Sequence, residues 1–186
     1  MTVHFTCRTE LPVAPERAFE LSRSIDAHLG SMADTREQAV GGVTSGLIGD
    51  GEEVTWRARH FGVTWSMTSR ITAFDAPRSF TDEQVRGPFR SFRHVHTFVP
   101  VPEPVEGHFD EFSDRDGGRF DRLSDRKRGR FDELSDRAEC TLMIDDVTFT
   151  APFGPIGRLA ERIALASHLR RLIESRNAWL SDHVRR

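Results

Sequence analysis

The sequence contains no tyrosine and only two cysteines among its 186 residues. Without tyrosine, no mechanism can use a phenol as an acid or as a hydrogen-bond donor to an oxyanion. Cys7 and Cys140 are too few for a disulfide framework or a zinc knuckle. No apolar run approaches the roughly 18 residues that a spanning helix needs, so we predict no membrane span.

The net charge and the N-terminal sequence each disfavour one possibility: a nucleic-acid partner and a secretory signal. The formal net charge is −3, which lacks the positive excess typical of nucleic-acid-binding proteins, so we predict no nucleic-acid partner. The first ten residues, MTVHFTCRTE, hold no apolar stretch of the kind found in secretory signals. We therefore expect a cytoplasmic protein, and its oligomeric state stays open.

One segment, residues 102–137, differs from the rest in composition. An 11-residue unit recurs as GHFDEFSDRDG, GRFDRLSDRKR and GRFDELSDRAE. Each unit has few apolar residues and is interrupted by glycine, so stacked units could not bury a continuous face. We predict a single domain over residues 1–186 with 102–137 as a disordered, charged insert between the last two strands. The alternative is a docking arm that folds on a partner.

The remaining residues show the periodicities of an antiparallel sheet and a long helix. Apolar residues alternate with hydroxyl and charged residues over 63–73, which is the clearest strand signal. Pro15 favours a helix start, and a second short helix is expected over 25–33. Further strands are expected over residues 2–11, 54–60, 79–85, 89–99 and 140–149. Near the C-terminus, a 3.6-residue apolar stripe over 156–180 predicts a long helix with basic residues, Arg176 among them, on its solvent side.

This order predicts an α+β fold in which a curved antiparallel sheet of six to seven strands wraps around the C-terminal helix. Three segments also resemble the START-like, helix-grip superfamily (SRPBCC), which includes polyketide cyclases. They are LPVAPERAFELSRSIDAH, ITAFDAPRSFTDEQVRGPFRSFRHVHTFVP and DDVTFTAPFGPIGRLAERI. The resemblance implies an elongated cavity between sheet and helix that takes a hydrophobic or amphipathic small molecule. The repeat insert is a departure from the superfamily pattern.

His94 and His96 are two residues apart on an expected strand, so they share a face with Phe92 and Phe98. If this face points inward, two imidazoles enter the cavity. One interpretation is acid–base catalysis by His94, His96 and Asp145. We favour hydrogen-bonded histidines that orient a ligand. A metal site would need a third ligand, such as His60 or Asp145, and we predict neither a metal nor another cofactor.

Asp145 and Asp146 fall on opposite faces of the last expected strand, so one of them points inward and needs a partner. Arg86, Arg93 or one of the histidines is the candidate partner. Arg86 precedes a Gly-Pro turn, where it is expected at the cavity mouth to bind an anionic group of the ligand.

The predicted function is binding or transport of a hydrophobic or amphipathic small molecule. The expected ligand-binding residues are Trp56, Trp65, Met67, Ile71, Arg86, Phe92, His94, His96, Phe98 and Met143. The alternative is an enzyme of the polyketide cyclase or dehydratase type, in which a cavity histidine moves a proton. We favour the non-catalytic binding role.

Overall fold

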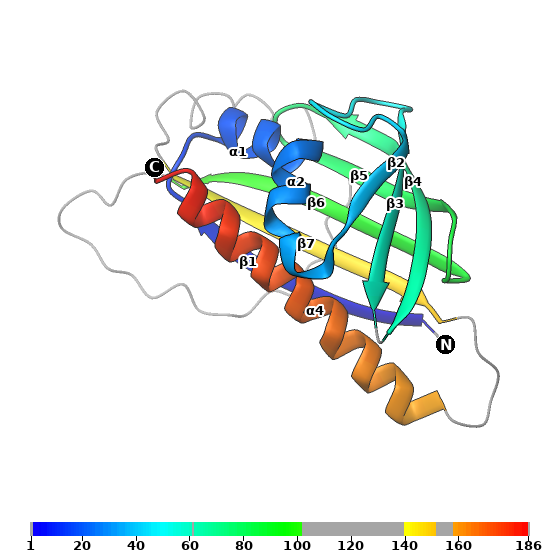
Figure 1. The fold of residues 1–186 in the computed structure, drawn as a ribbon. Coiled ribbons are helices and arrows are strands. Elements are labelled where there is room, and N and C mark those ends of the chain that lie inside the picture. Colours follow the sequence, from blue (N-terminus) through cyan, green and yellow to red (C-terminus); the bar gives the residue numbers. More distant parts are fainter. Residues whose placement is uncertain (1, 61, 102–139, 152–157, 186) are drawn as a thin grey trace.

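The structure, a computed structural model, describes residues 2–60, 62–101, 140–151 and 158–185 (Figure 1). The insert predicted over 102–137 lies outside the described residues. The elements are β1 (Thr2–Leu11), α1 (Pro15–Ser22), α2 (Ile25–Ser31), a 3-10 turn η1 (Ala33–Thr35), β2 (Gln38–Gly42), β3 (Glu53–His60), β4 (Val63–Asp75), β5 (Ser79–Arg86), β6 (Ser91–Val101), β7 (Cys140–Thr150) and α4 (Arg158–His183).

The strands form one antiparallel sheet of seven strands in the order β1-β7-β6-β5-β4-β3-β2. The first strand pairs with the last strand over its full length, from Thr2 opposite Thr150 to Leu11 opposite Thr141. Helices α1, α2 and α4 lie on the same side of this sheet (Figure 1). The predicted α+β helix-grip architecture is confirmed.

Local sequence signals explain where the two short helices begin. Pro15 occupies the first turn of α1, where its missing N–H costs no hydrogen bond. Ser24 caps α2 by accepting a hydrogen bond from the backbone N–H of Ala27 at 3.1 Å. Asp26, in the first turn of α2, accepts a hydrogen bond from the backbone N–H of Gly46 at 2.8 Å, which ties the β2–β3 loop to this helix.

Two tight turns set the positions of β4, β5 and β6. The backbone N–H of Arg78 donates to the Asp75 carbonyl at 2.7 Å in the β4–β5 turn, which contains a cis peptide bond before Pro77. In the β5–β6 turn, the Gln84 side chain donates to the Phe89 carbonyl and accepts from the Phe89 N–H, at 2.8 and 3.1 Å. These bonds hold Phe89 over the inner face of the sheet.

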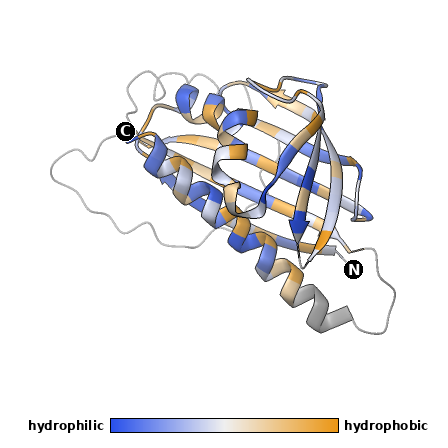
Figure 2. Ribbon diagram, in the orientation of Figure 1, coloured by the Kyte–Doolittle hydropathy of each residue, from blue (hydrophilic) through white to orange (hydrophobic). Residues whose placement is uncertain are grey.

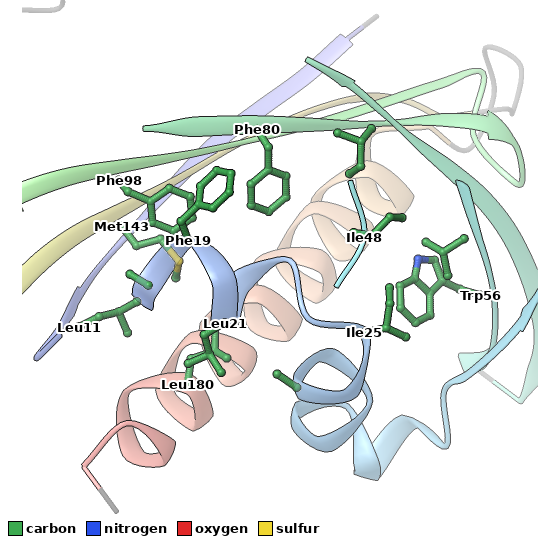
Figure 3. Packing of buried hydrophobic residues seen from close by; sticks show 14 residues of the cluster. Leu11, Phe19, Leu21, Ile25, Ile48, Trp56, Phe80, Phe98, Met143 and Leu180 are labelled. Atoms are coloured by element: carbon green, nitrogen blue, oxygen red, sulfur yellow. The ribbon is translucent and has the colours of Figure 1, made fainter. Parts of the chain in front are cut away.

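Hydrophobic and hydrophilic positions alternate along the strands, so one face of the sheet is apolar (Figure 2). Phe19 of α1 packs edge-on against the rings of Phe74, Phe80 and Phe98, with centroids 5.2–5.5 Å apart. Leu180 of α4 belongs to the same cluster (Figure 3). The core therefore joins the sheet, α1 and the end of α4.

Within the part of the chain that the structure describes, no helix is both long enough and apolar enough to cross a bilayer.

Candidate functional site

A cavity of about 490 Å³ lies between the sheet, α2 and α4. Its wall includes seven of the residues predicted to bind ligand: Trp56, Trp65, Met67, Ile71, Phe92, His94 and His96. Further apolar side chains come from the helices and loops: Ile25, Met32, Ile48, Phe89, Leu165, Leu169, Leu172 and Ile173. Alternation along β3, β4 and β6 therefore brings these side chains to one apolar space, which α2 and α4 cover.

Among the described residues, the cavity wall does not include Arg86, Phe98 or Met143, so their predicted place in it is wrong. Phe98 and Met143 share the inner face, but they are fully buried in the core beneath α1, where the Ser22 hydroxyl contacts the Met143 sulfur at 3.3 Å. Arg86 is exposed at the end of β5. The turn after it supplies Phe89 to the wall instead.

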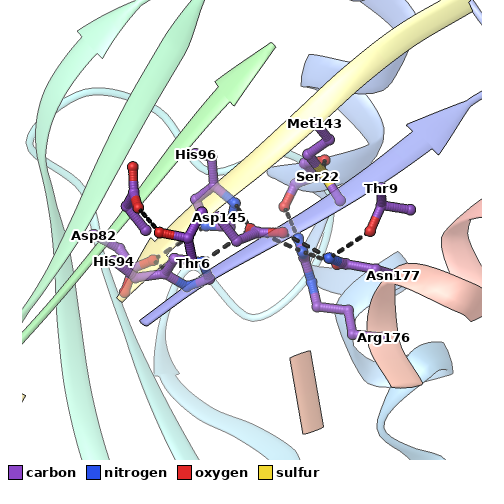
Figure 4. Close-up of polar contacts among 11 residues, drawn as sticks. Thr6, Thr9, Ser22, Asp82, His94, His96, Met143, Asp145, Arg176 and Asn177 are labelled. Atoms are coloured by element: carbon purple, nitrogen blue, oxygen red, sulfur yellow. Dashed lines mark hydrogen bonds and ion pairs between the residues drawn. The ribbon is translucent and has the colours of Figure 1, made fainter. Parts of the chain in front are cut away.

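Two histidines of β6 converge on Asp145 of the neighbouring strand β7 (Figure 4). Nε2 of His94 and Nδ1 of His96 lie 2.9 and 2.8 Å from the same Asp145 oxygen, Oδ1. The two imidazole centroids are 3.9 Å apart. The register explains this convergence, because β6 and β7 pair His96 directly with Asp145.

Asp82 of β5 faces the other side of the two histidines. Its Oδ2 lies 3.7 Å from His94 Nδ1 and 3.5 Å from His96 Nε2. Strands β5 and β6 pair Asp82 with His94 and Phe80 with His96. Asp82 was not among the predicted site residues, although its two-residue spacing from Phe80 places both side chains on the inner face.

Two residues of α4 complete the cluster. The Asn177 amide donates to Asp145 Oδ2 at 2.6 Å, and Arg176 Nη1 lies 3.9 Å from Asp145 Oδ1. Arg176 also donates to the Ser22 carbonyl at 2.8 Å and is only 4% exposed. Its predicted place on the solvent side is therefore wrong. Its spacing of three from Ile173 and four from Leu180 is the signal that places it on the inner face.

The outer face of the same strands holds the remaining candidates. Asp146 points away from the cluster and accepts a hydrogen bond from the Thr6 hydroxyl at 2.5 Å. Arg93 pairs with Glu83 at 3.0 Å, so Arg93 is not the partner of Asp145. His60, considered as a metal ligand, lies at the end of β3, and its side chain is outside the described part of the structure.

The buried charges shift one another's pKa values. Burial by itself raises the pKa of Asp145, but the hydrogen bond with His94 and the adjacent His96 imidazole outweigh it and hold this pKa well below the ordinary value. For Asp82, burial is likewise outweighed, by His96 and His94, and its pKa is lowered. Both carboxylates are therefore ionised at neutral pH.

The histidines shift in opposite directions. Burial and the nearby charge of His96 lower the pKa of His94. Burial also disfavours the charged form of His96, but the carboxylates of Asp145 and Asp82 outweigh this and raise its pKa. Of the pair, His96 therefore holds a proton more readily. A protonated His96 and Arg176 would balance the two carboxylates.

Two further polar features lie in the cavity wall. His28 Nε2 is 3.2 Å from Glu37 Oε2, and the His28 ring stacks on Trp56 with a centroid distance of 4.2 Å. The Ser69 hydroxyl is buried and has no hydrogen-bond partner within the described part of the chain. The cavity is thus apolar with a few separate polar groups, as in many small-molecule sites.

No family model matches the chain, and no curated protein matches it. Solved structures do match. The protein TTHA0849 of Thermus thermophilus is 14% identical with a TM-score of 0.65, over 98% of this chain and 97% of its own. A START superfamily protein of Mycobacterium smegmatis is 9% identical with a TM-score of 0.60, over the same shares of the two chains.

A third match is the Zhui aromatase/cyclase of Streptomyces, at 13% identity and a TM-score of 0.64, over 100% of this chain and 95% of its own. Identities this low carry information on fold and not on activity. Three features of this chain agree with the helix-grip fold of these neighbours. They are the antiparallel sheet, the two short helices after β1 and the long C-terminal helix. The chain therefore has the START-like, helix-grip fold.

Proposed function

We propose that the chain binds a hydrophobic or amphipathic small molecule in the cavity between the sheet and α4. The observation that carries the proposal is the cavity of about 490 Å³ with a mainly apolar wall. Ligand sites commonly enclose about 300–1,000 Å³ and combine apolar walls with a few polar groups. Trp56 and Trp65 supply large contact surfaces on the sheet side, and Leu169 supplies one from α4.

The polar groups of the wall favour a ligand that carries oxygen atoms. The buried Ser69 hydroxyl could be satisfied by a ligand hydroxyl or carbonyl, since leaving it unpaired costs about 1–3 kcal/mol. His28 and His96 offer further hydrogen bonds at separate places in the wall. A ligand with an apolar body and more than one oxygen fits this arrangement better than a plain hydrocarbon.

The test uses the fluorescent probe 1-anilinonaphthalene-8-sulfonate and a substitution that fills the cavity. Ser69→Phe places a large side chain in the wall, so probe affinity should fall at least about tenfold. Ser66→Phe is the matched control, because Ser66 is exposed and lies on the other face of β4. Equal probe affinity in both variants would contradict the proposed site.

A second candidate function is acid–base catalysis of the cyclase or dehydratase type. It is supported by the paired histidines in the cavity wall, and one neighbour is named an aromatase/cyclase. In that case His96→Gln should lower turnover of a polyketone analogue at least about 100-fold while probe binding is retained. Absence of turnover by the wild-type chain across several polyketone lengths would leave binding as the supported function.

A further inference from the structure

We propose that Asp82, His94 and His96 form a binding site for one divalent transition-metal ion, of the Zn²⁺ or Fe²⁺ class, in the cavity wall. All three ligands are side chains of this chain, so the site does not depend on which apolar molecule the cavity takes. It revises the prediction from sequence that there is no metal, because the third ligand considered there was His60 or Asp145 and not Asp82.

The distances among the three side chains fit ligands around a shared ion. Asp82 Oδ2 is 3.7 Å from His94 Nδ1 and 3.5 Å from His96 Nε2, and one ligand atom of each residue lies within 4.8 Å of the other two. Such separations are too long for good N–H···O hydrogen bonds. Two ligand atoms each about 2.1 Å from one ion lie roughly 3.0–3.4 Å apart, so a small inward movement closes the site.

Asp145 lies behind the two imidazoles and is hydrogen-bonded to His94 Nε2 at 2.9 Å. His96 Nδ1 lies 2.8 Å from the same oxygen, although this contact lacks hydrogen-bond geometry. In neutral imidazoles, protons on these two nitrogens leave lone pairs on His94 Nδ1 and His96 Nε2, the atoms that face Asp82. A hydrogen bond from a metal-binding histidine to a carboxylate behind it is common around protein metal ions, and His94 has this arrangement.

The site opens on the cavity. Asp82, His94 and His96 all contribute to the cavity wall, whereas the fully buried Asp145 does not. Two histidines and one carboxylate on one side of an ion leave its other positions free, as in sites that bind Fe²⁺ or Zn²⁺. Those positions would face the ligand, so an oxygen of the ligand could bind the ion directly.

The surrounding charges are compatible with a cation. Figure 4 shows Asp82 and Arg176 on opposite sides of Asp145. Arg176 contacts Asp145 and the Ser22 carbonyl, and its charge also acts on Asp82. When both imidazoles are neutral, the carboxylates of Asp82 and Asp145 face one guanidinium, and a bound cation would supply the positive charge that the proton on His96 supplies otherwise.

The experiment is a Co²⁺ titration of the full-length chain after treatment with a chelator, followed by visible absorption. One Co²⁺ per chain is expected, with a saturable absorption band and a dissociation constant below about 10 µM. Asp82→Asn should weaken binding at least about tenfold. Glu83→Gln is the matched control, because it removes the same charge from the outer face of β5, and it should bind like the wild type.

Two results would overturn the proposal. One is the absence of saturable binding below millimolar Co²⁺, and the other is an Asp82→Asn variant that binds as tightly as the wild type. If circular dichroism shows that this variant is unfolded, X-ray absorption of the wild-type Co²⁺ complex decides instead. Two imidazole nitrogens around the ion would support the site, and fewer than two would overturn it.

Discussion

Asp145 is surrounded by polar side chains from two other elements, β6 and α4. It lies at hydrogen-bonding distance from His94, His96 and Asn177, with Arg176 3.9 Å away. It has no exposed surface. A buried carboxylate is tolerated only when such partners satisfy both oxygens, so this one residue links β6, β7 and α4.

Removal of the Asp145 charge should destabilise the fold. Asp145→Asn keeps the size of the side chain but leaves Arg176 and the imidazoles with one carboxylate fewer, so the free energy of unfolding should fall by about 3 kcal/mol. Asp146→Asn is the control, because Asp146 lies on the outer face of the same strand and should cost less than about 1 kcal/mol. Urea unfolding at pH 7 measures both, and equal losses would contradict the role assigned to Asp145.

The same residues predict how stability depends on pH. The pKa values of Asp82 and Asp145 are lowered in the folded chain relative to the ordinary value of 3.8. Each carboxylate therefore contributes stability above that value, and the contribution is lost as pH falls through the lower pKa of the folded state. His94 and His96 shift in opposite directions, so their effects near pH 6.5 oppose each other.

Urea unfolding at a series of pH values between 7 and 3 should thus show the steepest loss of stability below about pH 4. The Asp145→Asn variant should show a shallower loss there. A wild-type profile that is flat from pH 5 to pH 3 would contradict the lowered pKa values.

At the level of single residues, the sequence predicted which side chains of β6 point inward, but not which side chains of other elements contact them. The two-residue spacing of His94 and His96 was enough to place them together. The cluster also needs Asp82, Arg176 and Asn177, which come from other elements. These three residues reach the cluster because β5 pairs with β6 and α4 packs on the sheet. Neither strand pairing nor helix packing can be inferred from residue spacing along one element.

At the level of elements, strands with long alternation were predictable and the short edge strand was not. The run over 63–73 became β4, Val63–Asp75, because its apolar face is continuous. Strand β2, Gln38–Gly42, has only five residues and two glycines, and its pairing with β3 contains a register shift between Ala39 and Gly41. Strand β2 is held in the sheet by its pairing with β3, because its own residues have little preference for strand conformation.

Gly42 is the residue of β2 with the strictest backbone requirement. It has φ +70°, and a Cβ there would clash with the Glu53 carbonyl oxygen of β3. Gly42→Ala should therefore lower the free energy of unfolding by more than about 2 kcal/mol. Gly46→Ala is the matched control, because Gly46 has φ +73° with no atom near its Cβ position, and it should cost about 1 kcal/mol.

Thermal unfolding of the two variants separates the clash from the backbone preference. If Gly46→Ala proved as damaging as Gly42→Ala, the close contact between β2 and β3 would not be the cause.

For the whole molecule, the order of elements was sufficient to predict the fold, since a sheet with one apolar face and a helix with one apolar stripe must cover each other. The extent of the cavity was not predictable in the same way. Phe98 and Met143 share the inner face with the cavity residues, but α1 packs on them through Phe19 and Ser22. Which part of the inner face is filled depends on where the short helices dock.

The pairing of β6 with β7 predicts that the fold does not need the repeat segment. The two strands pair from Ser91 opposite Thr150 to Val101 opposite Cys140, so their ends already meet. Replacement of residues 102–139 by a two-residue Asn-Gly turn should therefore leave probe affinity within about twofold and the fold intact. A variant that fails to fold, as measured by circular dichroism, would contradict this independence.

The measurement that tests the central claim most directly is native mass spectrometry of the full chain after incubation with a lipid extract. The account predicts one bound small molecule per chain that is lost on denaturation, with lower occupancy in Ser69→Phe than in Ser66→Phe. A wild-type chain that keeps the mass of its sequence throughout, or equal occupancy in the two variants, would contradict ligand binding in the cavity between the sheet and α4.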